Sequence, residues 1–367
     1  MSNFPMRHVA KEGHTDLFPS YPAPSSSDEQ TMLVGSTRRS FQDPWEHQAF
    51  YRGAHMKVLV TTTGRYCSAL TRIDLHNLGM QRNETSLPQI FHAVNTTDRC
   101  AISFIADSQF PTVYHNGDEL LPDVVIVSSM NDEHHCRMTG PSRLGTMSLS
   151  PADLAVASHA IVGRELVTPT AMQRIKVSDP QMIRLRRVHE SACHLAANAP
   201  DILSHPEVAR AIKEQLVRAM VGCLAEAASG KGNAGSHLRM PVMRRFEQAI
   251  ADAEGQPLYL TEICAKIGVQ ERTLRNHCYE YLGISPHRYL WLRRMDRVRK
   301  ALSLAEPMGT TVTSVANDYG FWELGRFSVA YRKLFGETPS TTLRKSPEDV
   351  KGEVQFGAAP SRVPILL

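Results

Sequence analysis

The spacing of apolar residues changes along the chain and divides it into regions of different structure. Residues 1–48 have no periodicity and are rich in proline, serine and other polar residues, and residues 20–30 read SYPAPSSSDEQ. A segment of this composition buries too little apolar surface to offset the entropy lost on ordering. We therefore expect residues 1–48 to be disordered.

Short apolar runs follow between residues 49 and 165, separated by Gly, Pro and Asn. The clearest runs are 58–60, 90–94, 102–105 and 124–127. Runs of this length bounded by turn residues are typical of β-strands. Asn116-Gly117 favours a type I′ hairpin turn between residues 112–115 and 119–121. The pattern predicts a β-rich domain over residues 49–165, built as a small barrel or sandwich.

Helical spacing replaces the strand pattern in residues 175–227. One apolar stripe comprises Met182, Leu185, Val188, Ala192 and Leu195. A second stripe comprises Val208, Ile212, Leu216, Met220 and Leu224. Such spacing predicts two amphipathic helices, here an antiparallel pair that covers the β-rich domain. Because the second stripe is longer than such a cover requires, we also expect this helix to form a homodimer contact.

A polar, Gly-rich segment separates the helical pair from the last third of the chain. Residues 228–237 read ASGKGNAGSH, a composition typical of a flexible linker. We place the linker at residues 228–240, a further domain at 241–345 and a C-terminal tail at 346–367.

The domain at 241–345 contains an internal repeat. The pattern I-C-x-x-I-G-V at residues 263–269 matches V-A-x-x-Y-G-F at residues 315–321, an offset of 52 residues. Further matches, at an offset of 53 residues, pair Leu274, Leu282, Gly283, Ser285 and Pro286 with Phe327, Phe335, Gly336, Thr338 and Pro339. The change of offset indicates one extra residue in the turn of the second copy.

Each copy has the parts of a helix-turn-helix unit: a small residue where two helices approach, a glycine that ends the first helix with positive φ, and an apolar anchor on the second helix. These residues are Cys264, Gly268 and Leu274 in the first copy, and Ala316, Gly320 and Phe327 in the second. One copy alone would describe many helical hairpins. Two matched copies favour helix-turn-helix motifs at about 260–281 and 312–335, a form that places one helix in the major groove of DNA.

Residues 285–302 read as one long helix between the two copies. Its apolar stripe comprises Tyr289, Leu292, Met295, Val298 and Leu302. Arginine and lysine load the remaining faces, at Arg288, Arg293, Arg294, Arg297, Arg299 and Lys300. A helix of this length spans ~27 Å at 1.5 Å per residue. It would hold the two units about one DNA turn apart, ~34 Å.

Positive charge is concentrated in the same region. Residues 241–345 hold 16 Lys and Arg against 11 Asp and Glu, whereas the rest of the chain holds 25 against 26. A localised basic excess indicates a polyanion partner. The chain has neither a run of ~18 apolar residues for a membrane helix nor a signal-peptide pattern. Its seven scattered cysteines form no CxxC pair, which indicates reduced thiols and a cytoplasmic location.

The chain offers little for an enzyme. His134, His135 and Cys136 are adjacent, and His92 and His115 lie in the same β-rich region. Neighbouring strand residues point to opposite faces, so His134 and His135 cannot both point inward on a regular strand. There is no hydroxyl–His–acid set and no Gly-rich phosphate loop. We expect no enzymatic activity, no cofactor and no metal site.

Residues 242–345 resemble the arabinose-regulator (AraC/XylS) family of bacterial transcription factors. The resemblance rests on L-x-x-I-C-x-x-I-G-V at 260–269, R-T-L at 272–274, L-G-I-S-P-x-x-Y-L at 282–290, Y-G-F at 319–321 and F-G-x-T-P at 335–339. It implies a seven-helix DNA-binding domain with two recognition helices that enter successive major-groove turns. It also implies an upstream effector-binding and dimerisation half. The variant G-F-W-E-L-G-R-F-S at 320–328 is similar to the ethanolamine-operon-regulator-like subgroup.

The resemblance also implies which side chains read DNA, since Arg pairs bidentately with guanine and Asn with adenine. The DNA-binding set is Arg272, Thr273, Arg275, Asn276, Arg326, Ser328 and Lys333. For Arg272 and Arg275 a contact to phosphate alone is the alternative. Val329 stands where many family members carry a basic residue, and Gly325 where many carry a small hydroxyl, so the second helix is expected to read fewer bases.

Taken together, the sequence predicts an α+β multidomain protein: a β-rich sensor domain with two helices, then an all-α DNA-binding domain. We expect a transcription regulator that binds double-stranded DNA and activates a metabolic or catabolic operon with RNA polymerase, in response to a small-molecule effector. The effector and its binding residues are unknown. The alternative is a constitutive regulator whose β-rich domain is a dimerisation or partner module.

Overall fold

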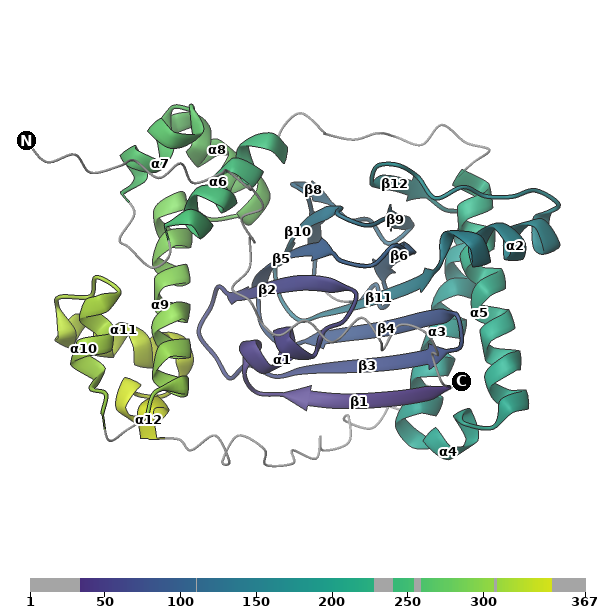
Figure 1. The fold of residues 1–367 in the computed structure, drawn as a ribbon, viewed down its shortest axis with the longest axis horizontal. Coiled ribbons are helices and arrows are strands. Elements are labelled where there is room, and N and C mark those ends of the chain that lie inside the picture. The colour runs from purple at the N-terminus through teal and green to yellow at the C-terminus, as the bar shows by residue number, and fades with distance from the viewer. Residues whose placement is uncertain (1–33, 110, 228–239, 254–258, 307–308, 345–367) are drawn as a thin grey trace, which may run out of the picture.

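The computed structural model describes residues 34–109, 111–227, 240–253, 259–306 and 309–344. A β-sheet domain with its own helices is followed by a helical domain, and the two lie side by side (Figure 1). This order agrees with the predicted α+β architecture. The predicted tail at 346–367, and all but the last residue of the linker at 228–240, lie outside the described residues.

Seven strands form the larger sheet, in the order β1-β3-β4-β11-β6-β9-β12, and each pairs antiparallel with its neighbours. Their bounds are β1 Gly35–Phe41, β3 Ser68–Leu75, β4 Leu78–Thr85, β11 Ser142–Leu149, β6 Cys100–Ile105, β9 Val124–Ser128 and β12 Gln173–Lys176. β12 lies beyond residue 165, the predicted end of the β-rich domain. It adds to the edge of the sheet through its pairing with β9.

The expectation of disorder over residues 1–48 is wrong from residue 35 onward. β1 pairs with β3 along its whole length, and the short helix α1 (Pro44–Phe50) follows it. The Asp43 side chain caps α1 by accepting the Trp45 amide at 2.7 Å. Pairing with a neighbouring strand supplies order that local composition did not indicate, while residues 1–33 lie outside the described part of the chain.

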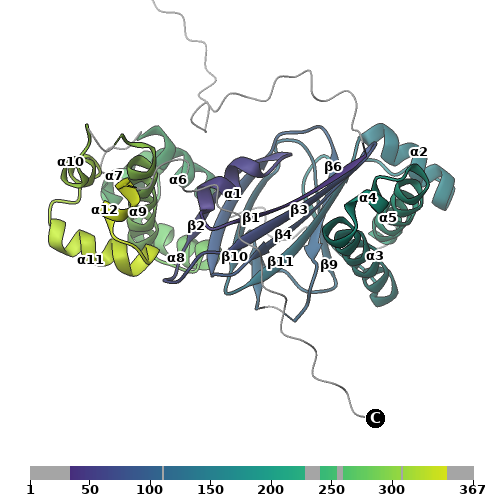
Figure 2. The same cartoon turned by 90° about the horizontal axis from the view of Figure 1, so that it is seen from below.

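Five strands form the smaller sheet, in the order β2-β5-β10-β7-β8. Their bounds are β2 Ala54–Val60, β5 Gln89–Asn95, β10 Glu133–Met138, β7 Val113–His115 and β8 Asp118–Glu119. The predicted hairpin joins β7 to β8, with φ of 52° at Asn116 and 90° at Gly117. Apolar residues of β6 and β9 pack with residues of β7 and β10. The described strands therefore form two facing sheets, and the barrel alternative is not what the chain adopts (Figure 2).

Helices cover the outer face of the seven-stranded sheet. They are α2 Pro151–Val162, α3 Asp179–Asn198, α4 Pro200–Leu203 and α5 Pro206–Ala227. α3 and α5 are the predicted pair. Leu216 and Met220 of α5 are fully buried in one core with Leu185 of α3 and Ile73 of β3. Since Leu216, Met220 and Leu224 of the α5 stripe are buried inside the subunit and Ile212 is partly buried against the same core, little of the stripe is left for the predicted dimer contact.

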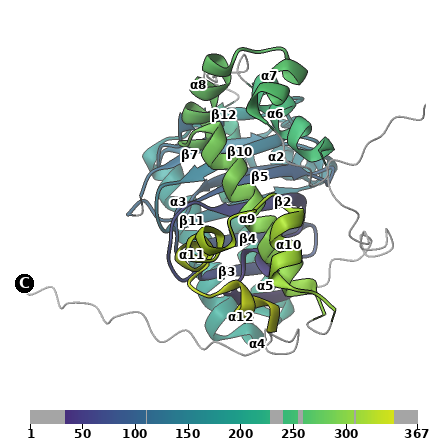
Figure 3. The same ribbon diagram turned by 90° about the vertical axis from the view of Figure 1, so that its left-hand side faces the viewer.

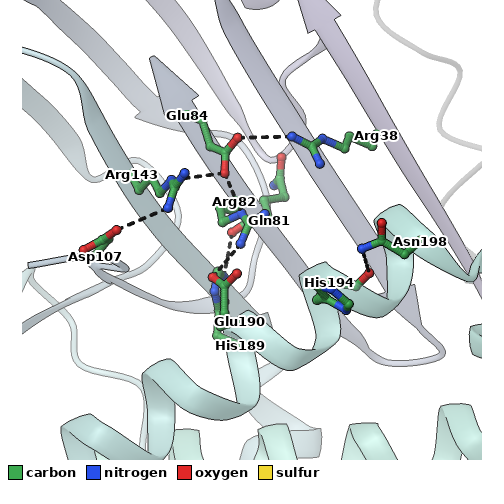
Figure 4. Close-up of polar contacts among 10 residues, drawn as sticks. All are labelled: Arg38, Gln81, Arg82, Glu84, Asp107, Arg143, His189, Glu190, His194 and Asn198. Carbon is green, nitrogen blue, oxygen red and sulfur yellow. Dashed lines mark hydrogen bonds and ion pairs between the residues drawn. The ribbon is translucent and has the colours of Figure 1, made fainter. Parts of the chain in front are cut away.

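Charged side chains also attach α3 to this sheet (Figure 4). Arg82 of β4 pairs with Glu84 on its own strand at 3.1 Å and with Glu190 of α3 at 2.6 Å. Arg82, whose side chain is almost fully buried, thus links α3 to β4. Beside it, His189 Nε2 lies 3.2 Å from the Gln81 carbonyl oxygen.

The helical domain is built around one long helix. Its elements are α6 Met240–Asp252, α7 Leu260–Ile267, α8 Glu271–Leu282, α9 Pro286–Leu304, α10 Val312–Asp318, α11 Leu324–Phe335 and α12 Pro339–Arg344. α9 is the predicted connecting helix, capped by Ser285, and its whole predicted apolar stripe is buried. α7 and α8 lie at one end of α9, and α10 to α12 lie at the other (Figures 1 and 3). None of the helices in the described residues is long and apolar enough to cross a membrane.

Candidate nucleic-acid interface

The first copy of the repeat folds as α7, a tight turn and α8. Gly268 ends α7 with φ of 70°, and the Val269 amide donates to the Cys264 carbonyl at 3.1 Å. This bond satisfies a carbonyl that the end of the helix would leave open. Leu274 is fully buried between the two helices, as predicted. Gln270 precedes α8 without a side-chain capping bond.

The second copy repeats this geometry in α10 and α11. Gly320 has φ of 75°, and the Phe321 amide donates to the Ala316 carbonyl at 2.9 Å. Ala316 is fully buried, and the anchor Phe327 packs on Phe321 with ring centroids 5.1 Å apart. The turn covers residues 319–323 and is two residues longer than the turn at 268–270 in the first copy, where the offset predicted one extra residue. The structure thus brings the six predicted motif residues into equivalent places.

The outward face of α8 carries the predicted base-reading side chains. Arg272, Thr273, Arg275 and Asn276 are all exposed. Arg275 pairs with Glu271 one turn earlier, with Nη2 and Oε1 2.6 Å apart. The face therefore presents two guanidinium groups and an amide to solvent, and one of the guanidiniums is held by a carboxylate.

The outward face of α11 has a different character. Arg326 and Lys333 are exposed and Ser328 is half-buried. Arg326 pairs with Glu323 at 2.9 Å. Two large apolar side chains lie exposed beside these residues, Trp322 at 72% and Val329 at 71%. Trp322 was not among the candidates from the sequence, although an aromatic residue directly before a predicted recognition helix was a visible signal.

Several arginines of α9 contact other residues of the helical domain and are therefore not available to bind DNA. Arg293 Nη1 lies 3.0 Å from Glu247 Oε2, and the Tyr289 hydroxyl donates to Glu247 Oε1 at 2.5 Å. Arg294 stacks on Phe321, with its guanidinium carbon 5.2 Å from the ring centroid. Part of the basic excess of this domain therefore stabilises its own helices. α8 and α11 lie on the same side of α9 (Figures 2 and 3).

The helical domain packs on the outer face of the five-stranded sheet. Leu59 of β2 and Ile90 of β5 belong to the same apolar cluster as the core of the helical domain. The end of α8 meets β10, where Gly283 lies so close to Arg137 that a Cβ on the glycine would come within 2.6 Å of that side chain. The ring of Tyr281 lies edge-on to His135 of β10. The C-terminal end of α8 is thus docked on the five-stranded sheet, while the predicted base-reading residues nearer its N-terminal end are exposed.

A second contact between the domains lies farther along α9. Arg299 Nη2 is 2.9 Å from Asp43 Oδ2, and the Lys300 ammonium is 4.1 Å from the centroid of the Trp45 ring. Asp296 lies among these groups. Burial and the charge of Asp43 raise the pKa of Asp296 to about 7, against the opposing effect of nearby arginines.

The alternation of residues on β10 separates two histidines, as the sequence predicted. His134 faces the space between the two sheets, where a cavity of about 100 Å³ is lined by residues of both. His134 Nδ1 lies 3.0 Å from His115 Nε2. Burial and the neighbouring imidazoles lower the pKa of His134 to about 4 and that of His115 well below its usual value. Both rings are therefore neutral near pH 7.

His135 faces the helical domain, next to His92 of β5 and Glu133 of its own strand. The three ligand atoms of these side chains lie within 4.8 Å of one another. No metal site was predicted among the histidines of this region, because the sequence does not show that β5 and β10 are neighbours. The spacing of Glu133 and His135, two residues apart on one strand, was the available signal.

Comparison with known proteins agrees with this geometry. A family model described as "Helix-turn-helix domain" matches residues 263–345. The chain is 38% identical over 92 residues to the "Probable thc operon regulatory protein" of Rhodococcus erythropolis. It is 32% identical over 110 residues to the "XylDLEGF operon transcriptional activator" of Pseudomonas putida.

Residues 263–345 therefore form a helix-turn-helix domain. The two alignments cover 25% and 30% of this chain, and 28% and 34% of the relatives. The matching segment thus spans about a third of the relatives' length. Both relatives are named as operon regulators. Among solved structures, that of the "AraC-like transcriptional activator CuxR" aligns with 77% of this chain and 100% of its own, at 15% identity and a TM-score of 0.37.

Proposed function

We propose that this chain is a transcription regulator that binds specific DNA sequences with α8 and α11. The observation that supports the proposal is that α8 and α11, each preceded by a glycine turn with positive φ, lie on the same side of α9. α9 has 19 residues, which makes it ~28 Å long at 1.5 Å per residue. This length suits two helices that enter successive major-groove turns ~34 Å apart.

α8 is the principal sequence reader in this proposal. Arg272 and Arg275 suit guanine, and Asn276 suits adenine. The pair between Arg275 and Glu271 is a surface contact within one helix, worth about 0.5 kcal/mol. A bidentate contact to a base discriminates by about 1–3 kcal/mol. DNA therefore competes successfully with Glu271 for this guanidinium.

α11 reads DNA more by shape and by apolar contact. Arg326, Ser328 and Lys333 supply polar contacts to bases and phosphates, and Thr273 of α8 supplies a further hydroxyl. Val329 is exposed where a recognition helix meets base edges, and an apolar side chain there suits the methyl group of thymine. Within the AraC/XylS family, the segment 320–328 favours the ethanolamine-operon-regulator-like subgroup.

We further propose that the cavity between the sheets binds a small polar effector. Its lining combines hydroxyl, amide and imidazole groups, at Ser103, Thr146, Asn95 and His134, with the apolar Phe91. A cavity of about 100 Å³ suits a molecule no larger than benzene, since benzene occupies a cavity of about 150 Å³. The alternative remains a constitutive regulator without an effector.

A thermal-shift screen of small polar compounds separates these two possibilities. The matched control is Ala93→Leu, which fills the cavity from β5 with an apolar side chain. A compound that stabilises the natural protein but not this variant supports the effector. If no compound does so, the constitutive alternative is favoured.

Activation is the proposed output, because a relative is named as an operon transcriptional activator. Activation implies contact with RNA polymerase at a metabolic or catabolic operon.

A homodimer is also proposed. Since most of the apolar stripe of α5 is buried, the dimer contact would use the outward faces of α2 to α4, where Val156, Ile183 and Ile202 are exposed. Sedimentation of the full chain at micromolar concentration tests the dimer.

DNA binding itself is tested by selecting bound fragments from genomic DNA with the full-length protein. Affinity for the enriched site and for a scrambled duplex is then measured at 50 and 200 mM salt. Neutralising 6–10 phosphates predicts a loss of about 10³–10⁵ in affinity over this range. Equal affinity for both duplexes, or binding that does not depend on salt, would contradict the proposal.

A further inference from the structure

Three side chains on the outer face of the five-stranded sheet point toward one another. Glu133 and His135 are two residues apart on β10 and so share a face. His92 of β5 stands directly opposite His135 in the strand register. His92 Nε2 lies 2.7 Å from Glu133 Oε1, and all three ligand atoms lie within 4.8 Å of one another.

The buried imidazole of His135 lacks hydrogen-bond partners. The residue is 1% exposed, and neither of its ring nitrogens has a partner among the described residues. His92 is also buried, and its Nδ1 has no partner there either. Leaving a buried polar group without a hydrogen-bond partner destabilises the fold. The two rings stack on each other with centroids 4.4 Å apart, but this contact leaves the ring nitrogens of His135 unpaired.

We propose that His92, Glu133 and His135 form a binding site for a divalent transition-metal ion of the zinc class, at the boundary between the two domains. Two imidazoles and one carboxylate are a ligand set that suits zinc. Magnesium and calcium prefer oxygen ligands throughout, and this site offers only one carboxylate. A water molecule would complete a tetrahedral shell.

The two imidazoles are stacked, with ring centroids 4.4 Å apart, and must tilt toward a common point to bind one ion. Tetrahedral ligands about 2.0–2.1 Å from a zinc ion lie about 3.3 Å from one another. The His92–Glu133 contact would open from 2.7 Å, and the wider separations would close. Both histidines stand on paired strands, so rotation of their side chains supplies the movement while the backbone keeps its register.

Residues of the helical domain border the site. Arg244 of α6 reaches Glu133, with Nε and Oε2 3.5 Å apart. The Tyr281 ring of α8 packs edge-on against His135, with ring centroids 6.3 Å apart. A bound ion would compete with Arg244 for the carboxylate. Metal binding and domain docking are therefore linked, and each must change the equilibrium of the other.

The test uses full-length protein stripped of metal by a chelator and titrated with Co²⁺, followed by competition with Zn²⁺. The variants His135→Gln, His92→Gln and Glu133→Gln each remove one ligand. The matched control is His134→Gln, which removes a buried histidine from the neighbouring position of the same strand, on the opposite face. Circular dichroism establishes that each variant is folded.

We expect one Co²⁺ per chain in the natural protein and in His134→Gln, with an absorption spectrum of nitrogen and oxygen ligands. Loss of one ligand should weaken binding by about 100-fold, because loss of a residue that only supports a ligand already costs about 10–100-fold in metal affinity. Three results would overturn the proposal: no stoichiometric ion in the natural protein, unchanged affinity in all folded ligand variants, or a spectrum dominated by thiolate charge transfer. None of these readouts involves DNA, so they do not depend on the proposed regulator function.

Discussion

Glu247 offers the most direct test of how the helical domain is held together. Its carboxylate, on α6, is 3% exposed and lies between two groups of α9. It accepts the Tyr289 hydroxyl at 2.5 Å and pairs with Arg293 at 3.0 Å. Replacing it with Gln removes the charge, and leaves the Arg293 side chain, which is 12% exposed, without a counter-ion.

Two estimates of the free energy of unfolding lost in Glu247→Gln agree. Removing one partner of a buried ion pair costs about 3–5 kcal/mol. Burial alone would raise the pKa of Glu247, but Arg293, the imidazoles of His92 and His135, and the Tyr289 hydroxyl lower it to about 2 from 4.5. At 1.36 kcal/mol per pKa unit this is about 3 kcal/mol. Because the folded pKa is lowered, this stability is present above about pH 4.5 and is lost as the pH falls toward 2.

The assay is urea unfolding of the full-length protein at pH 7, followed by tryptophan fluorescence, since Trp291 lies on α9. We expect Glu247→Gln to lower the unfolding free energy of the helical domain by about 3 kcal/mol. Asp252→Asn is the matched control on the same helix: it removes an exposed pair with Lys266 and should cost less than about 1 kcal/mol. If the two variants lower the unfolding free energy equally, burial is not the reason that the Glu247–Arg293 pair stabilises the domain.

Three further perturbations test other parts of the molecule. Arg275→Ala should lower affinity for the cognate site by about 1–3 kcal/mol and leave affinity for scrambled DNA nearly unchanged, whereas Arg326→Ala should cost less discrimination; binding isotherms at one salt concentration compare them, and the reverse pattern would mean that α11 is the main reader. Since the folded pKa of Asp296 is raised to about 7, its contribution to stability is full below the unfolded pKa of 3.8 and falls as the pH rises through 7. Asp296→Asn should therefore gain more stability over the natural protein at pH 8 than at pH 4.5 in urea unfolding, and an equal difference at both pH values would count against the shift. Gly283→Ala should cost about 1 kcal/mol in backbone strain, as should Gly336→Ala, because both glycines have positive φ. Only Gly283→Ala should also speed hydrogen exchange in β10, because only that new methyl meets the sheet domain; equal exchange in the two variants would argue against docking through this glycine.

Local patterns predicted the elements that depend on local interactions. The stripe of α9, the Asn116-Gly117 hairpin, and the Gly268 and Gly320 turns follow from helical period and backbone geometry, and the structure confirms each of them. The anchor Leu274 is buried for the same reason. The helix α2 was missed inside the β-rich region, although Ser150-Pro151 with Asp153 is a helix start signal.

Features that depend on strand register could not be predicted in this way. β1 is ordered because it pairs with β3, and its own composition gives little sign of this. The meeting of His92 with His135 requires knowledge that β5 and β10 are neighbours. The docking of the helical domain on the sheet is equally hidden, because Leu59 and Ile90 read as ordinary strand residues. The sequence does not indicate which residues these side chains contact in the folded protein.

The alternating faces of β10 have a consequence for how such a protein can diversify. His134 and Cys136 line the cavity, while Glu133, His135 and Arg137 face the helical domain. Substitutions at the first set can change what the cavity admits, and substitutions at the second set can change how strongly the output domain is held. Neighbouring residues of this six-residue strand face either the cavity or the helical domain. Ligand selectivity and the strength of domain docking can therefore evolve independently, through substitutions at alternate positions.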